Sequence, residues 1–400
     1  MTLPTNLNLR HMEAATAVGQ LGSITAAALA VNLSQPTLTQ ALAKLEQRLG
    51  HRLFDRHPDG VTPTSAGTIF VRRTERAIAR LSQTCRVVRR AARLAPMAYP
   101  ERRLTMTQLR AFLSVEHNGS YALAARELGL AQPSVHRAAR ELEDVLGTPL
   151  FIRVGQRMRA TPSGDRLAQG VRLALVELRA GLDELAALTA AGAGRIVIGT
   201  LPLPRARLLP EVLARFADRL PQAQISVVEG LYPDLLSGLR NGEIDLLIGA
   251  LRTPAPGRDV VQRRLFDDDL YIVAGTGHPL AGRAPSHDEL ARYPWIIAPP
   301  GSPMRITWDA MFAGRSRPER QIECGSILVI RGMLLAGDWL ALMSVDQFPI
   351  ENRAGLLAAI GPCVPGSRRS IGLTTRADWA PTETQAALVV TLLAVAAERE

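Results

Sequence analysis

The chain has 400 residues, 47% hydrophobic and 21% charged, which is an ordinary soluble globular composition and enough length for two or three domains. Its net charge of +10 is confined to the first half: +8 in residues 1–100, +2 in residues 101–190 and zero in residues 191–400. This asymmetry indicates polyanion binding at one end and another task at the other. Frequent Arg (Lys44 is the only lysine) explains the number of cations but not their distribution.

Targeting segments, membrane spans and metal sites find no support in the sequence. The N-terminus lacks the apolar core of a signal peptide. Residues 14–43 carry no charge, but Gln20, Asn32 and Pro36 interrupt the apolar run, which excludes a membrane span. The cysteines have no metal-ligand or CxxC spacing and are expected to be reduced thiols of a cytoplasmic protein: Cys85, Cys324 and Cys363.

The first half contains a repeat. Residues 9–67 align without a gap with residues 106–164, at a shift of 97. Identical pairs run through both copies: Gly22/Gly119, Ser23/Ser120, Ala27/Ala124, Ala28/Ala125, Leu33/Leu130, Gln35/Gln132, Pro36/Pro133, Leu45/Leu142, Glu46/Glu143, Leu49/Leu146, Gly50/Gly147, Leu53/Leu150, Phe54/Phe151, Arg56/Arg153, Thr64/Thr161 and Gly67/Gly164. A gapless match of this length indicates a duplicated module.

One module has the pattern of a winged helix-turn-helix. In the second copy, an apolar stripe predicts a first helix that ends at Asn118-Gly119-Ser120. Gly129 closes a short second helix, and Pro133 lies in the first turn of a third helix with a polar, basic outer face. Two short strands, 150–153 and 158–161, follow as a basic wing that would reach phosphates or the minor groove.

Four motifs carry a family resemblance. They are S-Q-P or A-Q-P at the opening, then L-E-x-x-L-G, L-F-x-R and finally T-S-A-G or T-P-S-G. In this combination both copies resemble the winged helix-turn-helix of LysR-type transcriptional regulators, and the resemblance extends through the C-terminal half. The chain departs from the family pattern by carrying two modules, and by having Ala131 where the first copy keeps Ser34.

The resemblance implies a ligand-responsive transcriptional regulator that binds a duplex DNA operator and a small-molecule effector, forms a homodimer or homotetramer, and acts on RNA polymerase. It implies no membrane association and no cofactor. The expected DNA-binding residues are Ser34, Gln35, Pro36, Thr37, Thr39, Gln40, Lys44 and Arg56 in the first copy, and Gln132, Pro133, Ser134, His136, Arg137, Arg140, Arg153, Arg157 and Arg159 in the second.

A helix is expected after each module. The modules span 1–64 and 105–162, the helices 65–94 and 163–191, and a joint 95–104 separates the two halves. The second helix has a narrow apolar stripe, Leu167, Val171, Leu175, Leu178, Leu182 and Leu185. By resemblance this is the linker helix through which family members dimerise. The alternative is a core helix that packs on its own chain.

From residue 194 to residue 398 the pattern changes to strands alternating with helices. Strands are expected at 195–201, 224–230, 245–251, 295–299, 321–324 and 339–344, with helices at 205–219 and 232–241. This resembles the two-lobed α/β effector domain of LysR-type regulators, which is similar to periplasmic binding proteins. Lobe I would cover about 194–273 and 372–398 and lobe II about 274–371, with 269–275 and 370–376 as crossing strands.

Ligands in such sheets bind beyond the carboxyl ends of the strands, where helices begin. The expected effector-binding residues are Thr200, Leu201, Pro202, Leu231, Tyr232, Ala250, Ser302, Pro303, Met304, Arg305 and Ser326. Thr200 and Ser302 have helix capping as an alternative role, and Arg305 either meets an anionic effector or stays solvated.

Other chemistries have weaker support. Asp267-Asp268-Asp269 is interpreted as a solvated turn rather than a metal site, because adjacent side chains on an extended segment point to opposite faces. His278 is expected to be a turn residue. No catalytic motif is present, and Cys324 is expected to be a strand cysteine rather than a nucleophile. An enzymatic or purely architectural DNA-binding protein remains the alternative function.

The duplication itself suggests that both modules contact DNA. The first copy keeps Ser34, Gln35, Thr37, Thr39 and Gln40 and has the larger positive charge, so it is expected to supply most of the affinity. A dimer would then offer four modules. In the alternative, one copy serves only for packing or dimerisation.

Overall fold

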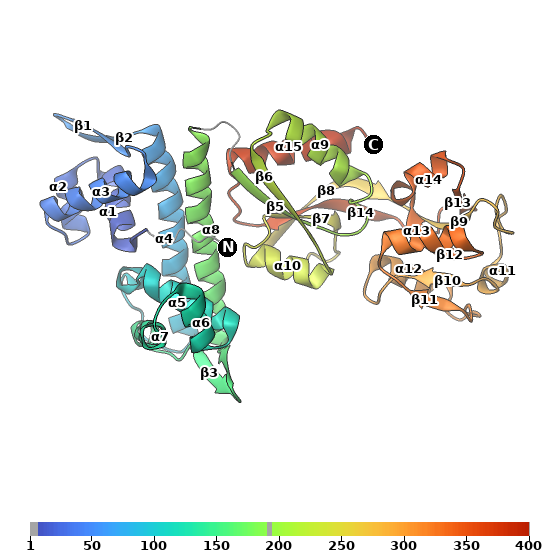
Figure 1. Cartoon of the computed structure of the whole chain (residues 1–400), viewed down its shortest axis with the longest axis horizontal. Coiled ribbons are helices and arrows are strands. Elements are labelled where there is room, and N and C mark those ends of the chain that lie inside the picture. Colours follow the sequence, from blue (N-terminus) through green and yellow to red (C-terminus); the bar gives the residue numbers. More distant parts are fainter. Residues whose placement is uncertain (1–6, 190–193, 400) are drawn as a thin grey trace. The chain divides into compact units, whose positions relative to one another are not determined.

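The computed structural model describes residues 7–189 and 194–399, which form two compact units, Met1–Gly194 (unit 1) and Arg195–Glu400 (unit 2). Unit 1 contains the two modules. The first comprises α1 (Leu9–Leu21), α2 (Ile24–Ala30), α3 (Gln35–Leu49), β1 (Phe54–His57) and β2 (Gly60–Pro63), and α4 (Ser65–Ala91) follows it (Figure 1).

The second module repeats this order. After the short 3-10 helix η1 (Pro100–Arg103) come α5 (Met106–Asn118), α6 (Tyr121–Leu128), α7 (Gln132–Leu146), β3 (Phe151–Val154) and β4 (Arg157–Ala160), and then the long helix α8 (Pro162–Ala187). Each module is thus three helices and an antiparallel hairpin, as expected from the residue pattern.

The shared motifs tie the helices to the hairpins. Glu46 Oε1 accepts hydrogen bonds from the backbone N–H of Leu53 (2.8 Å) and of Phe54 (3.3 Å). Glu143 makes the same two bonds to Leu150 and Phe151, at 2.8 and 3.2 Å. The L-E-x-x-L-G and L-F motifs therefore fix where the wing leaves the third helix.

The T-x-x-G motif allows the next helix to start against the wing. Thr64 and Thr161 cap α4 and α8 by accepting from the N–H of Gly67 and Gly164. A Cβ at Gly67 would overlap the carbonyl oxygen of Leu53, and a Cβ at Gly164 that of Leu150. Only glycine permits this approach.

The two third helices begin differently. Ser34 caps α3 by accepting from the Thr37 N–H at 3.3 Å. Ala131 holds the same position before α7 and offers no side-chain cap. Without a hydroxyl at this position, the Ser134 N–H donates instead to the backbone carbonyl of Ala131, at 3.0 Å.

Helices α4 and α8 pack against each other in antiparallel orientation and lie side by side in Figure 1. Small residues let them approach at two points. A Cβ at Gly170 would overlap the Thr84 hydroxyl, and a Cβ at Gly181 would lie 3.0 Å from Arg73 Cβ.

A buried ion network joins the same two helices. The Arg73 guanidinium donates to Glu177 at 2.9 Å and to Glu184 at 2.5 Å, and the three side chains are 3%, 6% and 7% exposed. Arg76 and Arg80 also reach Glu177, at 2.9 and 3.1 Å. Burial alone would raise the pKa of Glu177, but the arginines hold it below its usual value.

The apolar stripe of α8 is covered within the chain. Leu167, Val171, Leu175, Leu178 and Leu185 are 0–4% exposed, in one core with residues of α4 and of both modules. This packing corresponds to the alternative in which the helix packs on its own chain, and it leaves that stripe unavailable to a second copy.

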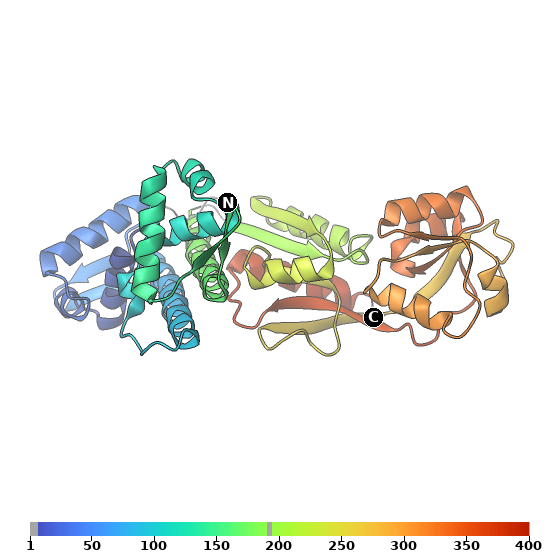
Figure 2. The ribbon, with the colours of Figure 1, turned by 90° about the horizontal axis from the view of Figure 1, so that it is seen from below.

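Lobe I of unit 2 is a five-stranded sheet in the order β6-β5-β7-β14-β8. Its strands are β5 (Gly194–Thr200), β6 (Ala223–Glu229), β7 (Leu246–Ala250), β8 (Val260–Asp268) and β14 (Arg369–Arg376), and its helices are α9 (Leu208–Arg219), α10 (Tyr232–Arg240) and α15 (Glu383–Ala397) (Figure 2). β5 and β7 are parallel, whereas β14 runs antiparallel to β7 and β8.

Lobe II has a second five-stranded sheet, in the order β11-β10-β12-β9-β13. It contains β9 (Leu270–Gly275), β10 (Trp295–Ile297), β11 (Gln321–Glu323), β12 (Leu340–Ser344) and β13 (Leu357–Ile360), with α11 (His287–Ala291), α12 (Pro303–Met311), α13 (Ile327–Ala336), the 3-10 helix η2 (Val345–Gln347) and α14 (Pro349–Arg353). Both units therefore bury their own cores, and each lobe has a separate one.

The lobes meet several residues away from the expected boundaries. The strands expected to cross each belong to one sheet, β9 to lobe II and β14 to lobe I, and β8 and β13 were not anticipated. The chain changes lobe at Asp269, between β8 and β9, because Asp268 still pairs with Arg369 of β14. The return to lobe I comes just before Arg369.

The interpretation of residues 267–269 as a solvated turn was wrong. Asp267 and Asp268 end β8, and the half-buried Asp268 pairs with Arg369 at 2.8 Å and accepts from Ser344. Arg264 and Ser370 hold the pKa of Asp267 well below its usual value. These carboxylates serve as ion-pair partners at the junction of the lobes.

Among residues 7–189 and 194–399, no helix combines the length and apolar character needed to cross a bilayer. Within the same ranges, His, Cys, Asp and Glu side chains form no cluster of three suited to a metal ion. Cys85 is buried, and burial raises the pKa of its thiol to about 12. His278 is a buried turn residue whose Nδ1 accepts from the Leu280 N–H.

We predict that Glu177→Gln lowers the free energy of unfolding of unit 1 by about 3 kcal/mol, because Arg73 stays buried with one charged partner fewer. Hydrogen exchange of the α4 and α8 amides in the full chain measures this loss. Asp165→Asn is the matched control, since Asp165 is exposed in the first turn of the same helix. Equal protection in both variants would contradict the prediction.

The same pair predicts a pH dependence. Because the folded-state pKa of Glu177 is depressed, its stabilising effect is complete above the unfolded value of about 4.3 and is lost as the pH falls through the lower folded value. The measurement is the free energy of unfolding of the full chain, taken at intervals of about one pH unit between about pH 6 and 3. This free energy should fall less steeply with decreasing pH in Glu177→Gln than in the parent protein.

We also predict that Ala131→Ser stabilises the start of α7 by about 1 kcal/mol. The new hydroxyl would accept from the Ser134 N–H, as Ser34 does from Thr37, in place of the tight-turn bond that this N–H now makes to the Ala131 carbonyl. Slower hydrogen exchange at Ser134 reports the new cap. Ser34→Ala is the reciprocal control and should accelerate exchange at Thr37. An Ala131→Ser protein with unchanged exchange would show that another constraint controls this turn.

Candidate functional site

In the first module, α3 turns a polar face to solvent. Leu38, Leu42 and Leu45 are buried against the other helices. The DNA-binding residues expected on this helix lie on the opposite side. Thr39 is half-buried, and the others are exposed: Ser34, Gln35, Pro36, Thr37, Gln40 and Lys44. The period of the buried residues therefore determines which side chains a groove would meet.

In the second module, α7 presents a more basic face. Gln132, Pro133, His136, Arg137 and Arg140 line one shallow, open hollow on its surface, and Ser134 is exposed beside them. The His136 ring lies 4.9 Å from that of Tyr121 in α6, which holds the imidazole at the helix surface. Arg140 also contacts Glu143 at 3.3 Å but remains 65% exposed.

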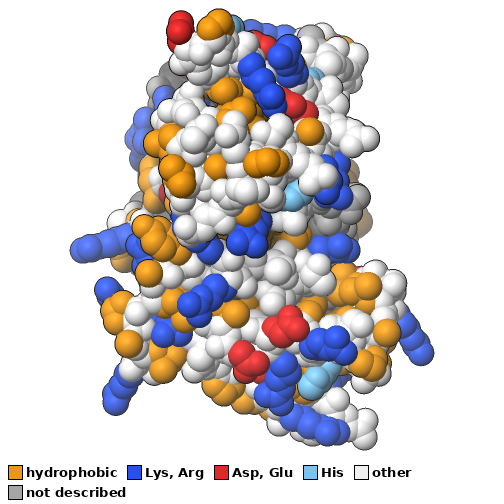
Figure 3. Space-filling view, turned by 90° about the vertical axis from the view of Figure 1, so that its left-hand side faces the viewer, with side chains coloured by type: hydrophobic (Ala, Val, Ile, Leu, Met, Phe, Trp, Pro, Cys, Tyr) orange, Lys and Arg blue, Asp and Glu red, His pale blue; other side chains and the backbone are white. Residues whose placement is uncertain are grey.

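The wings are anchored to their own helices. Val61 in β2 donates to the Gly22 carbonyl at 2.9 Å, and Met158 in β4 donates to that of Gly119 at 2.8 Å. The wing arginines project from these hairpins and are exposed: Arg56, Arg153, Arg157 and Arg159. Figure 3 views unit 1 from the side of the first module, where Lys and Arg side chains are more prominent than Asp and Glu.

Sequence reasoning missed one wing cation. Arg52 is exposed at the entry to β1, where it contacts Asp55 at 3.5 Å and donates to the Phe54 carbonyl. Its counterpart in the second module is Pro149, so alignment of the two copies draws attention away from it. The acidic neighbour also masks it in a count of net charge.

Unit 2 has a cleft between its two lobes with a cavity volume of about 640 Å³. Most of the expected effector-binding residues line it, from the ends of β5, β6 and β7 and the start of α12: Leu201, Pro202, Leu231, Tyr232, Ala250, Ser302, Pro303 and Met304. Ser302 both lines the cleft and caps α12 by accepting from the Arg305 N–H, so its two candidate roles coincide.

Three expected residues do not line the cleft. Thr200 is fully buried, and its hydroxyl donates to the Leu201 carbonyl. Ser326 lies between two lining residues and provides no side-chain cap to α13. Arg305 does not line the cleft, and its guanidinium is paired with Asp309 at 3.1 Å and Glu323 at 3.4 Å.

The cations that do line the cleft were not anticipated. Arg205, Arg252 and Arg369 come from lobe I, and two of them are neutralised, Arg205 by Glu229 and Arg369 by Asp268. Arg252 forms no ion pair with any carboxylate of the described residues. Its sequence context, a lone Arg after β7, offered no signal to separate it from a surface arginine.

Arg252 instead stacks on an aromatic ring. Its guanidinium carbon lies 4.2 Å from the centroid of Tyr232, and burial lowers the pKa of the arginine without discharging it. The Tyr232 hydroxyl is buried and has no hydrogen-bond partner among the described residues. The lining of the cleft thus offers one unneutralised cation beside mainly apolar side chains such as Leu203, Ile327 and Ile330.

Cys324 lies at the end of β11 and lines the same cleft. It is half-buried, not enclosed in the sheet as expected, and its sulfur lies 3.8 Å from the Ser326 carbonyl. Neither His278 nor any other histidine of the described residues is among the lining side chains, so the cleft does not assemble a Cys–His pair.

Two protein-family descriptions match the chain. "LysR substrate binding domain" matches residues 189–397. "Bacterial regulatory helix-turn-helix protein, lysR family" matches twice, at residues 9–68 and 106–165. The second description therefore covers the stretches that the structure folds as the two helical modules.

Similar proteins are transcriptional regulators. The HTH-type transcriptional regulator GalR of Pseudomonas putida is 31% identical over 394 residues, 98% of each chain. The HTH-type transcriptional regulator CbbR of Xanthobacter flavus is 30% identical over 260 residues, 64% of this chain and 77% of the relative.

Solved structures share the fold at low identity. Full-length OxyR of Pseudomonas aeruginosa has a TM-score of 0.53 and 21% identity and covers 72% of this chain and 93% of its own. Full-length LysG of Corynebacterium glutamicum, with bound effector Arg, has a TM-score of 0.55 and 18% identity, covering 73% of this chain and 97% of its own.

Proposed function

The chain belongs to the LysR family of ligand-responsive, DNA-binding transcriptional regulators, and we propose that both of its winged helix-turn-helix modules contact duplex DNA while the cleft of unit 2 binds a small acidic effector. The observation that carries this proposal is the pair of exposed polar helix faces, on α3 and α7, each flanked by an arginine-bearing wing.

The division of labour on DNA follows from side-chain chemistry. Gln40 and Lys44 on α3, and Arg137 and Arg140 on α7, are long enough to reach base edges or phosphates from a helix lying in the major groove. The wing arginines face the phosphate backbone, which they contact without regard to sequence. A module kept only for packing would have no need of these exposed side chains.

The effector is expected to combine an apolar body with an acidic group. Arg252 supplies an unneutralised, half-buried charge, and a carboxylate placed there would replace the solvation that the guanidinium has lost. The apolar lining would bury the remainder of the ligand.

Ligand binding would alter DNA recognition by favouring one arrangement of the two lobes over another. Members of the family form oligomers, and we propose a homodimer or homotetramer that uses surfaces other than the covered stripe of α8. The protein would act in the cytoplasm, where it meets its operator and RNA polymerase.

We predict that Arg137→Ala costs roughly 1–3 kcal/mol of binding free energy on a preferred duplex and relaxes the preference at one base position. Arg157→Ala, in the wing, should weaken all duplexes alike and reduce the slope of log affinity against log salt by about 1. Titrations at several salt concentrations measure both quantities. Arg258→Ala, an exposed arginine in unit 2, is the control and should change neither.

Binding that does not depend on salt in the parent protein would contradict the proposed interface, because neutralised phosphates must release counterions. In a second possible outcome, the parent protein shows the expected salt dependence but Arg137→Ala keeps full affinity. This result would support DNA contacts by the wings and would show that Arg137 of α7 does not contact a base.

For the cleft, we predict that Arg252→Gln weakens an acidic effector by about 10- to 100-fold, because a hydrogen bond to a charged group contributes roughly 1.5–3 kcal/mol. The probes are pairs that share an apolar body and differ in charge, such as benzoate with benzyl alcohol and hexanoate with hexanol. Thermal stabilisation of the full chain measures binding. Arg258→Gln is the matched control, exposed in the same loop and outside the cleft.

The carboxylates should stabilise the parent protein and the control more than the alcohols do, and this difference should vanish in Arg252→Gln. If the alcohols stabilise the parent protein as well as the carboxylates, the effector class proposed here is wrong.

A further inference from the structure

The contacts between α4 and α8 repeat with the symmetry of the duplication. Arg73 meets Gly181, and Thr84 meets Gly170. At the shift of 97, Arg73 corresponds to Gly170 and Thr84 to Gly181. Exchanging the two helices therefore turns the first contact into the second. Contacts related in this way are typical of a twofold-symmetric interface.

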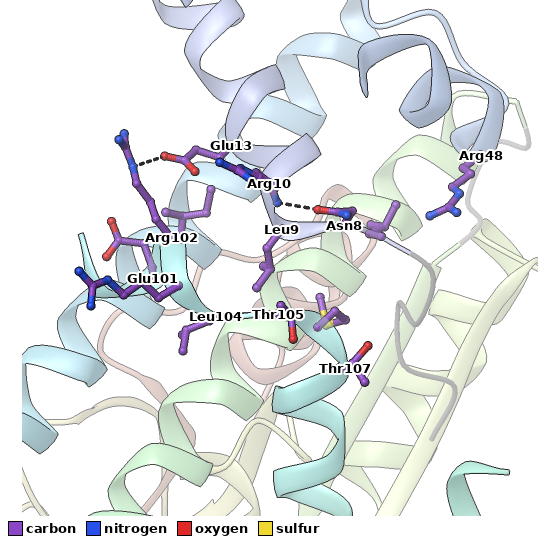
Figure 4. Close-up of a pocket in the computed structure, with 14 residues that line it drawn as sticks. Asn8, Leu9, Arg10, Glu13, Arg48, Glu101, Arg102, Leu104, Thr105 and Thr107 are labelled. Atoms are coloured by element: carbon purple, nitrogen blue, oxygen red, sulfur yellow. Dashed lines mark hydrogen bonds and ion pairs between the residues drawn. The ribbon is translucent and has the colours of Figure 1, made fainter. Parts of the chain in front are cut away.

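The entrances of the two modules follow the same relation. One hollow of about 540 Å³ is lined by residues 7–10 and by residues 104–107, which are equivalent at a shift of 97. Figure 4 shows the starts of α1 and α5 beside this hollow, with Asn8 and Thr105, which cap these helices. Ile78, at the midpoint of the pseudo-symmetric contacts in α4, lines it too.

The charges break this symmetry. Glu177 and Glu184, which neutralise Arg73, correspond to Arg80 and Val87 in α4. If α4 paired with a second α4 in the same geometry, the buried Arg73 and the half-buried Arg76 would face Arg80 instead of Glu177. Like charges in a buried contact are strongly unfavourable, so α4 is built to reject its own copy.

The same holds for α8. In a pair of α8 helices, Arg73, Arg76 and Arg80 would be replaced by their equivalents Gly170, Leu173 and Glu177. Glu177 would then be buried against Gly170, Leu173 and a second Glu177, with no cation facing it. Only the unlike pair, α4 with α8, gives every arginine and glutamate of this network an oppositely charged partner.

We infer that the two modules of one chain pair with each other through α4 and α8. A single chain would then form a complete DNA-binding unit of two modules, called a reading head below, for a DNA operator with two inverted and unequal half-sites. This inference rests on the proposed function, since it assumes that α3 and α7 both contact DNA. It replaces the expectation that two copies must pair their linker helices to bring two modules together.

The half-sites differ because the two reading faces differ. At equivalent positions of the two copies, Gln40 corresponds to Arg137 and Lys44 corresponds to Glu141. A glutamine pairs with the edge of adenine, an arginine with that of guanine, and an acidic residue accepts from cytosine. The pseudo-twofold relation sets the half-sites in inverted orientation, and these substitutions make their sequences unlike.

The first test is selection of preferred duplexes from a randomised DNA pool by the full-length protein. We expect a site of two inverted halves that differ at one or more positions. A perfectly palindromic site would overturn the inference, because it would show two identical modules at work. If no sequence is enriched at all, the proposed DNA-binding function fails, which is a different result.

A substitution assigns the halves. Gln40→Arg gives α3 the side chain that α7 has, so it should change the preferred base in one half only, with a shift of about 10-fold in relative affinity. Arg137→Gln is the reciprocal variant and should act on the other half. A variant that changes both halves together would overturn the inference.

Tethered cleavage locates each module on the selected duplex. Asp59 and Gln156 are exposed equivalents at the tips of the two wings. A DNA-cleaving reagent on Asp59→Cys should cut one half-site, and on Gln156→Cys the other, with reagent-treated parent protein as the control for the natural cysteines. Cutting of both halves from Gln156→Cys would show that two second modules pair between chains.

Mixing separates pairing within a chain from exchange between chains. One variant carries Gln40→Ala with Lys44→Ala, and the other Arg137→Ala with Arg140→Ala, and the two are co-expressed. Pairing within the chain leaves every reading head with one disabled module, so affinity for the selected duplex stays low. If α4 of one chain paired with α8 of another, some heads would have two intact modules, and recovered binding would overturn the inference.

Discussion

Burial of the Arg73 guanidinium between Glu177 and Glu184 is the interaction on which the first unit depends. A charge removed from water is tolerable only when its partners stay in place, and these partners lie more than a hundred residues away in sequence. The pair therefore holds α4 to α8, and with them the two modules that precede these helices. Close packing at Gly170 and Gly181 allows the charges to meet.

Much of the motif shared by the two modules is architectural. Glu46 and Glu143 do not face outward to a ligand but accept backbone hydrogen bonds that set the wing against the third helix. Thr64 and Thr161 cap the next helix, and the glycines after them make room for a carbonyl group. The exposed side chains that we propose as DNA contacts on α3 and α7 lie before these fixed points, and there Gln40 and Lys44 of the first copy are replaced by Arg137 and Glu141 in the second.

In the second unit, too, most of the partly buried arginines are neutralised by carboxylates. Two of the three arginines that line its cleft are committed to carboxylates, and the third rests on an aromatic ring. Arg252 can thus keep a charge in a half-buried place without a protein counter-ion, because stacking on Tyr232 replaces part of its lost hydration. Under the function proposed above, a ligand with its own negative charge would complete the site.

From sequence alone, the repeat, the helices and hairpin of each module, the buried faces and most of the cleft could be predicted, because helical period, capping residues and glycine positions are local properties. Tertiary structure decided what local patterns leave open. The apolar stripe of α8 looks the same whether its partner is a second copy or α4 of its own chain, and only the ion pair between Arg73 and Glu177 distinguishes these two partners.

In the same way Arg305 and Arg252 look alike in sequence. The carboxylates Asp309 and Glu323 neutralise the first, whereas Tyr232, twenty residues from Arg252, leaves the second charge available. Pairing across distant segments depends on three-dimensional position, which no single stretch of sequence encodes.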